Sequence, residues 1–142
     1  MGNKDIVKEL NAYLKGEYMG IHAYEHYIQQ VEDPTVKKEL QRIQQEHKRH
    51  AAKLAERIQN LGGKAVEDNG LMLSIREGML NIKGFPEDIN AILQEAMKGQ
   101  EKGVQMAEEI VRGDIDQESR QIVEENLDED REHLDQLNNL MQ

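Results

Sequence analysis

The chain has 142 residues, a length that suits one domain, and its 28 acidic against 18 basic residues give a formal charge of −10 at pH 7. This charge, with no basic stripe to offset it, argues against a nucleic-acid partner. Cysteine is absent, which excludes disulfides, thiolate zinc sites and iron–sulfur clusters. No apolar run is long enough for a membrane span or a signal peptide, so we expect a cytoplasmic protein with no membrane partner.

Apolar residues recur every three or four positions in residues 4–31 and predict a first long helix. Its seam is Leu10, Leu14, Glu17, Ile21, Tyr24, Ile28 and Val31. Asp33 and Pro34 end this helix and begin the next, since Asp is a good N-cap and Pro a good first-turn residue. The second helix ends at Gly62 and Gly63. Its seam is Val36, Leu40, Ile43, His47, Ala51, Leu54, Ile58 and Leu61.

The segment 63–86 connects this pair of helices to a second pair, and its apolar patch from Leu71 to Ile82 predicts one short helix. A third long helix follows Pro86, with the seam Leu93, Met97, Gln100, Val104, Ala107 and Val111. Gly113 ends it, and Asp116 is the expected N-cap of the fourth. The seam of the fourth helix is Val123, Leu127, Asp130, Leu134, Leu137 and Met141.

The two halves of the chain repeat each other. Residues 5–59, moved by 83 positions, align without a gap to 88–142 with 12 identities in 55 pairs. We therefore expect one domain over 1–142, made of two helical hairpins, 4–62 and 87–142, joined by the crossover 63–86. Tight turns within each hairpin and a long connection between them predict an all-α, antiparallel four-helix bundle with the ferritin-like topology.

Four polar residues interrupt the seams near the middle of their helices, and a histidine follows two of them by one turn. The six residues are Glu17, His47, His50, Gln100, Asp130 and His133. They would converge at one level of the interior, where isolated charges are costly unless they are paired or bind a metal. Carboxylates and imidazoles from facing helices are typical of iron and manganese sites in bundles. A hydrogen-bonded polar layer without metal is the alternative.

These motifs resemble the ferritin-like superfamily, in particular its bacterioferritin and rubrerythrin branches and small uncharacterised bacterial relatives. Glu17 and Tyr24 match the Glu-x-x-x-Ile-x-x-Tyr motif of the first helix, whose Glu is an iron ligand. The fourth-helix Glu-x-x-His motif is matched by Asp130 and His133, and that of the second helix by His47 and His50. Gln100 takes the place of the third-helix Glu.

The resemblance implies a metal site formed by these six residues, with Tyr24 beside it as a candidate catalytic residue. Two carboxylates of the family pattern are missing, which favours one divalent ion or a nitrogen-rich pair over a standard diiron centre. Iron is the expected metal, with manganese or zinc as alternatives. Glu46, Glu101 and Glu129 lie one position from the seam and form an alternative ligand set. Glu46 and Glu129 are otherwise the expected acceptors for the second ring nitrogen of a metal-bound histidine.

The function implied is iron handling or oxidative-stress defence, in which oxygen or peroxide oxidises Fe(II) as in a ferroxidase or peroxidase of the diiron oxidoreductase type. A homodimer is the expected assembly. The competing hypothesis is a metal-free helical interaction or stress-adaptor protein that retains the bundle and has a degenerate site.

Overall fold

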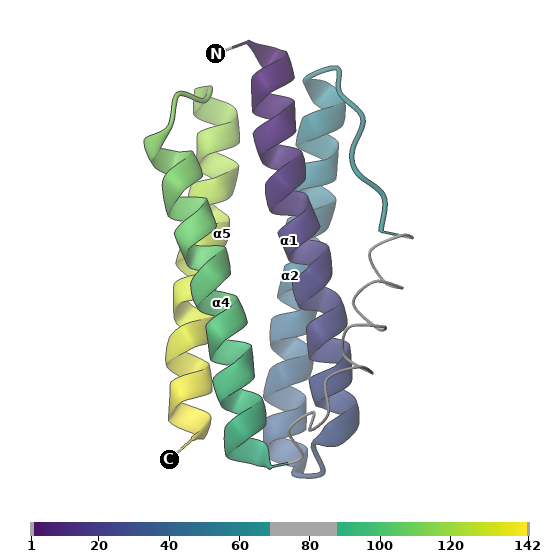
Figure 1. Cartoon of the computed structure of the whole chain (residues 1–142), viewed down its shortest axis with the longest axis vertical. Helices are drawn as coiled ribbons and strands as arrows, with labels where there is room; N and C mark the ends of the chain where they lie inside the picture. Colours follow the sequence, from purple (N-terminus) through teal and green to yellow (C-terminus); the bar gives the residue numbers. More distant parts are fainter. Residues whose placement is uncertain (1, 69–87, 142) are drawn as a thin grey trace.

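The computed structural model describes residues 2–68 and 88–141, which form an antiparallel bundle of long helices (Figure 1). The helices are α1 (Asn3–Gln30), α2 (Pro34–Asn60), α4 (Ile89–Arg112) and α5 (Gln117–Leu140). The predicted all-α four-helix bundle is thereby confirmed, with helix ends close to the predicted ones. The short helix predicted within 71–82 lies outside the described residues.

Side-chain caps begin three of these helices where the sequence places an aspartate. Asp33 accepts hydrogen bonds from the backbone N–H groups of Thr35 and Val36, at 2.9 and 3.2 Å. Asp88 and Asp116 cap α4 and α5 in the same way. Such caps satisfy backbone donors that have no partner inside the helix. After α2 the chain turns at Gly62, whose φ of 86° suits glycine.

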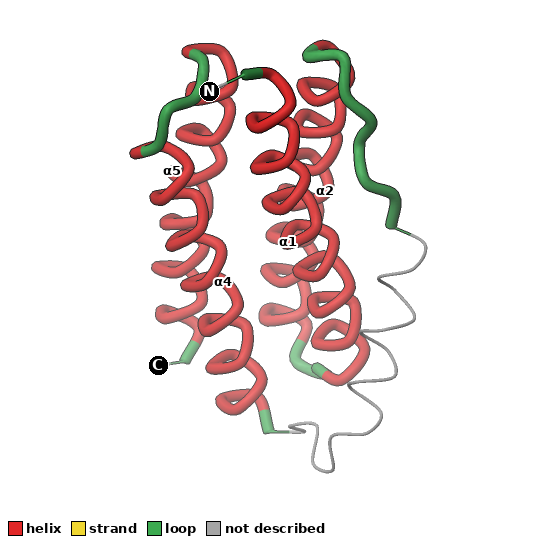
Figure 2. The backbone as a smooth tube through the Cα atoms, turned by 45° about the horizontal axis from the view of Figure 1, so that its top comes forward, coloured by secondary structure: helices red, strands yellow, loops and turns green. Residues whose placement is uncertain are grey.

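The two hairpins pack side by side, with α1 against α4 and α2 against α5 (Figure 2). The chain that follows α2 turns back along the outside of the first hairpin (Figure 1). Asn11 of α1 holds it there, since its side chain donates to the carbonyl of Lys64 at 3.0 Å and accepts from the N–H of Val66 at 2.8 Å. The crossover therefore starts in the direction that a long connection to the far end of the bundle requires.

The apolar core is divided into two clusters, and the polar residues of the seams separate them. One cluster contains Leu10, Leu54 and Ile58, and the other contains Leu40, Ile43 and Leu93. The predicted seam of α4 is wrong in part, because Val104 and Val111 are only half-buried while Ala96 and Ile110 are buried. Ile21 of α1 and Leu134 of α5 are also only half-buried. None of the described helices combines the length and apolar character that crossing a membrane requires.

Candidate metal centre

The six predicted polar residues do meet at one level of the bundle. Glu17 comes from α1 and Gln100 from α4, while α2 supplies His47 and His50 and α5 supplies Asp130 and His133. Each of the six is at most 5% exposed. The helix period accounts for this convergence, because residues three apart on α2 and on α5 share one face, turned toward the other helices.

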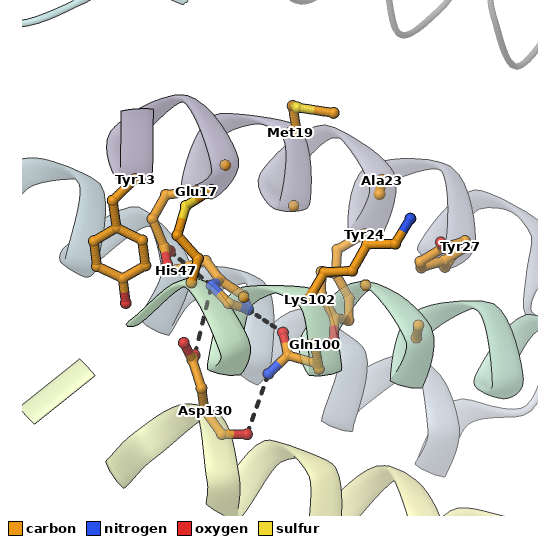
Figure 3. A pocket seen from close by; sticks show the side chains of 16 residues that line it. Tyr13, Glu17, Met19, Ala23, Tyr24, Tyr27, His47, Gln100, Lys102 and Asp130 are labelled. Carbon is orange, nitrogen blue, oxygen red and sulfur yellow. Dashed lines mark hydrogen bonds and ion pairs between the residues drawn. The ribbon is translucent and has the colours of Figure 1, made fainter. Parts of the chain in front are cut away.

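Four of the six form a cluster small enough to hold one metal ion. These are Glu17, His47, His50 and Asp130, whose candidate ligand atoms all lie within 4.8 Å of one another. Figure 3 shows three of them, with Glu17 and His47 adjacent and the Asp130 carboxylate reaching toward them from α5. The cluster thus draws on both hairpins, with two ligands from α2 and one each from α1 and α5.

His47 donates from both ring nitrogens. Its Nδ1 lies 2.8 Å from Glu17 Oε2, and its Nε2 lies 2.6 Å from the amide oxygen of Gln100 (Figure 3). Because both partners only accept, each ring nitrogen carries a proton and the ring is an imidazolium. Burial alone would lower the pKa of His47, but the Glu17 carboxylate and the other acceptors outweigh it and raise that pKa to about 9.

Glu17 is the counterpart of this cation. Burial alone would raise the pKa of its carboxyl group, but the hydrogen bond from His47 and the charges of His47 and His50 outweigh burial and lower that pKa to about 2. The carboxylate is therefore ionised at neutral pH and available as a ligand. Metal binding at His47 would require the imidazolium to lose a proton, because only a neutral nitrogen binds a metal.

The two other histidines are each held by a glutamate from the opposite hairpin. His50 donates from Nε2 to Glu129 at 2.6 Å, and His133 donates from Nε2 to Glu46 at 2.5 Å. The two pairs are equivalent in the repeat, since His50 and His133, like Glu46 and Glu129, are 83 positions apart. A carboxylate on the outer nitrogen fixes the ring and leaves Nδ1 facing the interior, as in many histidine–metal sites.

Two buried atoms of the cluster have no hydrogen-bond partner among the described residues. They are His50 Nδ1 and Asp130 Oδ1. His50 Nδ1 lies 3.5 Å from Glu17 Oε2 and 3.9 Å from Asp130 Oδ1. Both distances are longer than the usual N–H···O hydrogen bond, roughly 2.7–3.2 Å. Buried donors and acceptors are rarely left unpaired in proteins, and atoms that bind a metal ion are one class of exception. Two carboxylates would also neutralise one divalent cation, so the residues present fit a metal ion.

Gln100 and His133 lie beside this cluster without belonging to it. The amide nitrogen of Gln100 is 3.1 Å from His133 Nδ1, and it donates at 3.4 Å to the backbone carbonyl of Asp130. The amide oxygen of Gln100 is occupied by His47. The second half of the repeat thus carries a hydrogen-bonded amide where the first half carries the Glu17 carboxylate, which leaves less negative charge for a second ion.

Tyr24 lies directly against the site. Its ring stacks on that of His47, with centroids 5.5 Å apart, and its hydroxyl has no hydrogen-bond partner among the described residues. Burial, with smaller contributions from nearby acidic groups, raises the pKa of Tyr24 well above its usual value. The residue is therefore a neutral phenol in contact with the cluster. Its catalytic role stays a prediction.

The alternative ligand set is not assembled in this arrangement. Glu46 and Glu129 bind the outer nitrogens of the histidines, and Glu101 is exposed.

Sequence reasoning did not single out the arginines that hold these outer carboxylates. Arg49 donates to Glu129 at 2.8 Å, and Arg42 lies 3.4 Å from Glu46. The spacing of Arg42 and Glu46, one helical turn apart, was a usable signal, whereas Arg49 meets Glu129 only across the bundle.

Comparison with known proteins identifies the fold. No curated protein gave a significant match. The bacterioferritin-related protein of Bacteroides fragilis, a dodecameric thioferritin, is 23% identical and superposes over 98% of this chain and 85% of its own with a TM-score of 0.83. A ferritin-like, diiron-carboxylate protein of Bacillus anthracis is 21% identical, over 99% of this chain and 97% of its own, with a TM-score of 0.76.

A mutant of Dps1 from Mycobacterium smegmatis is 15% identical, over 99% of this chain and 97% of its own, with a TM-score of 0.81. These likenesses establish the fold, and their low identities do not carry over a reaction. The family model described as "Domain of unknown function (DUF2383)" matches residues 5–113, so the chain belongs to that family and has the ferritin-like fold.

Proposed function

We propose that the chain binds one divalent transition-metal ion through Glu17, His47, His50 and Asp130, and that its physiological metal is iron. The observation that carries the proposal is the pair of unpartnered buried atoms, His50 Nδ1 and Asp130 Oδ1, inside a cluster of metal-binding size. Two imidazoles and two carboxylates suit Fe(II), Mn(II) or Zn(II). One ion is favoured over two because Gln100 supplies no charge and is hydrogen-bonded to His47.

If the metal is iron, the reaction that follows is oxidation of Fe(II) by oxygen or peroxide, in iron handling or oxidative-stress defence. Fe(II) would supply the electron to oxygen or peroxide, and the residues of this chain would hold the iron ion. Glu129 fixes the His50 ring, Glu17 contributes an ionised carboxylate, and Tyr24 covers one side of His47. The diiron-carboxylate description of the Bacillus anthracis neighbour supports this chemistry as a family precedent. A homodimer stays the expected assembly.

The competing function is that of a metal-free helical adaptor. One observation favours it, since Glu17 and His47 form an ion pair at 2.8 Å, in which their two charges neutralise each other without a metal. On this hypothesis the polar layer only specifies how the helices align.

Metal titration separates the two functions. Protein freed of metal with a chelator is titrated with Co(II), whose visible absorption reports ligand geometry, and with Fe(II) under anaerobic conditions before a pulse of oxygen. We expect one ion per chain, followed by oxidation of bound Fe(II). Glu17→Gln and His50→Ala should each abolish tight binding, whereas His22→Ala, which removes a histidine outside the cluster, should not. No saturable binding by the unaltered chain would favour the adaptor, and binding without oxidation would remove the redox reaction only.

A further inference from the structure

The side-chain amide of Gln100 contacts two histidines of the polar layer at once. Its oxygen lies 2.6 Å from His47 Nε2 (Figure 3), and its nitrogen lies 3.1 Å from His133 Nδ1. The amide nitrogen also lies 3.4 Å from the backbone carbonyl of Asp130. A carbonyl only accepts, so the atom beside it is the NH₂ group, and the amide oxygen is the atom that faces His47. This contact fixes which end of the amide each histidine meets.

The orientation of the amide leaves Nδ1 of His47 for the metal cluster. Because the amide oxygen only accepts, His47 carries a proton on Nε2, the nitrogen that does not face Glu17. Its Nδ1 lies 2.8 Å from Glu17 Oε2 and 4.0 Å from Asp130 Oδ1, so Nδ1 is the nitrogen that an ion would meet. Gln100 therefore holds the His47 ring for metal binding, as an acceptor on the other ring nitrogen commonly does.

The same amide covers the nitrogen that His133 could offer to a metal. His133 donates from Nε2 to Glu46 at 2.5 Å, and in a neutral imidazole the other nitrogen, Nδ1, then carries a lone pair. That lone pair accepts the N–H of Gln100. His133 Nδ1 lies only 3.4 Å from Asp130 Oδ1, so it is near the cluster. It has no lone pair left for an ion.

The internal repeat shows what the amide replaces. Gln100 is equivalent to Glu17, 83 positions earlier, and each is 4% exposed. A carboxylate at position 100 could still accept from His47, but it could donate neither to His133 nor to the Asp130 carbonyl. The lone pair of His133 would then be open, with a further carboxylate beside Asp130. Carboxylate and imidazole ligands of this kind suit a second divalent ion.

We propose that Gln100 limits the chain to one metal ion, because its amide directs His47 Nδ1 into the cluster and covers His133 Nδ1. Gln100 is thus a positioning residue, which selects the histidine ligands without being a ligand itself. The inference rests on the proposed function, since it concerns how many ions the same site holds. It gives the difference between the two halves of the repeat a chemical consequence.

The metal content of Gln100→Glu tests this proposal. Metal-free protein is dialysed against Co(II), and the bound ion per chain is measured by elemental analysis. We expect one ion in the unaltered chain and two in Gln100→Glu. Ions in two-metal sites lie about 3.5–4 Å apart, so the two Co(II) ions should couple and weaken the EPR signal per ion. Adding His133→Ala to Gln100→Glu should return the content to one ion, because the second ion depends on His133 Nδ1.

The matched control is Gln105→Glu, which makes the same change at an exposed position of α4 and should bind one ion. Gln100→Leu removes both contacts of the amide without adding a carboxylate. It should bind no second ion and should hold the first about 10- to 100-fold more weakly, because His47 loses its acceptor.

A measurement on the unaltered, metal-free chain covers the case in which Gln100→Glu does not fold. Nitrogen-15 NMR should show His133 with its proton on Nε2 and none on Nδ1, and a proton on Nδ1 would overturn the proposal. Two ions in the unaltered chain, or one ion in folded Gln100→Glu, would also overturn it and leave metal binding in place. No binding by the unaltered chain would overturn the proposed function together with this inference.

Discussion

His50 is the residue on which the proposed metal site depends most. It is fully buried, its Nε2 donates to Glu129, and its Nδ1 faces Glu17 and Asp130 without a hydrogen bond. The Glu129 carboxylate is held in turn by Arg49. Hydrogen bonds from His50 and Arg49 outweigh the effect of partial burial and lower the pKa of Glu129, so this carboxylate stays ionised as the acceptor.

The two outer glutamates give a test of which histidine binds the metal. Glu129→Ala removes the acceptor on His50 and should weaken metal binding about 10- to 100-fold, the usual effect of losing such a partner. Glu46→Ala removes the equivalent acceptor on His133 and should have a smaller effect, because His133 lies outside the four-residue cluster. Metal affinity is measured by competition with a coloured chelator. Glu124→Ala, at an exposed position of α5, is the control.

Equal losses in the Glu46 and Glu129 variants would contradict the single-ion arrangement and indicate that both histidines are ligands. Unchanged affinity in both would show that neither histidine binds through Nδ1.

The sequence predicts where the site lies, but not which of its residues form the four-residue cluster and which hold the histidine rings in place. Seam spacing placed Glu17, His47 and Asp130 at one level, because that level depends only on position along each helix. Whether a residue next to the seam points inward depends on the rotation of its helix by a fraction of a turn. Tertiary packing sets that rotation. The sequence therefore left two roles open for Glu46 and Glu129, metal ligands or acceptors for the outer histidine nitrogens, and the structure shows the second.

At the scale of the helices, the sequence predicted where each helix begins and ends better than it predicted which face of the helix is buried. An aspartate cap or a glycine stop is a local signal that needs no partner from elsewhere in the chain. The buried face of α4 is set instead by how this helix packs against α1 and α5. Ala96 is buried there while Met97 next to it is only half-buried, so a search for large apolar residues selects the wrong neighbour.

Asp116 joins two helices as well as capping one. Its Oδ2 accepts from the Ser119 backbone N–H at 3.0 Å and from Arg57 of α2 at 2.6 Å. Burial raises the pKa of Asp116, but the hydrogen bonds from Ser119 and Arg57 outweigh it and lower the pKa below its ordinary value of 3.8. Asp116→Ala should therefore cost about 1–2 kcal/mol of unfolding free energy at pH 7, measured by urea denaturation.

This contribution has a defined pH dependence. A carboxyl group whose pKa is lower in the folded state stabilises the protein above the pKa of the unfolded chain, and that stability is lost as pH falls through the folded-state pKa. The difference between the unaltered chain and Asp116→Ala should thus be constant from pH 7 to about 5 and shrink below 3.8. A difference that grows on acidification would contradict the ionised cap. Asp135→Ala, at an exposed position of α5, is the control.

For the whole molecule, the metal cluster lies where the two hairpins meet. Glu17, His47 and His50 belong to the first hairpin and Asp130 to the second. The repeat accounts for this placement, because equivalent residues of the two halves, such as His50 and His133, meet at the same level of the bundle. The halves have diverged there, with Glu17 opposite Gln100 and His47 equivalent to Asp130. A bound ion would therefore connect the two hairpins within the polar layer that separates the two apolar clusters.

Zn(II), which has no redox reaction to complicate the result, should accordingly stabilise the whole bundle. Free metal at 100 times its dissociation constant adds about 2.7 kcal/mol to a protein that binds it only when folded. For a chain of this size that corresponds to a rise in Tm of about 5–10 °C, reversed by a chelator. Asp130→Asn removes the carboxylate of the second hairpin and should abolish most of the rise, whereas Asp128→Asn, on the exposed side of α5, should retain it. An equal rise in the Asp130 variant would show that any bound ion is held within one hairpin, because the contact across the interface would then contribute nothing.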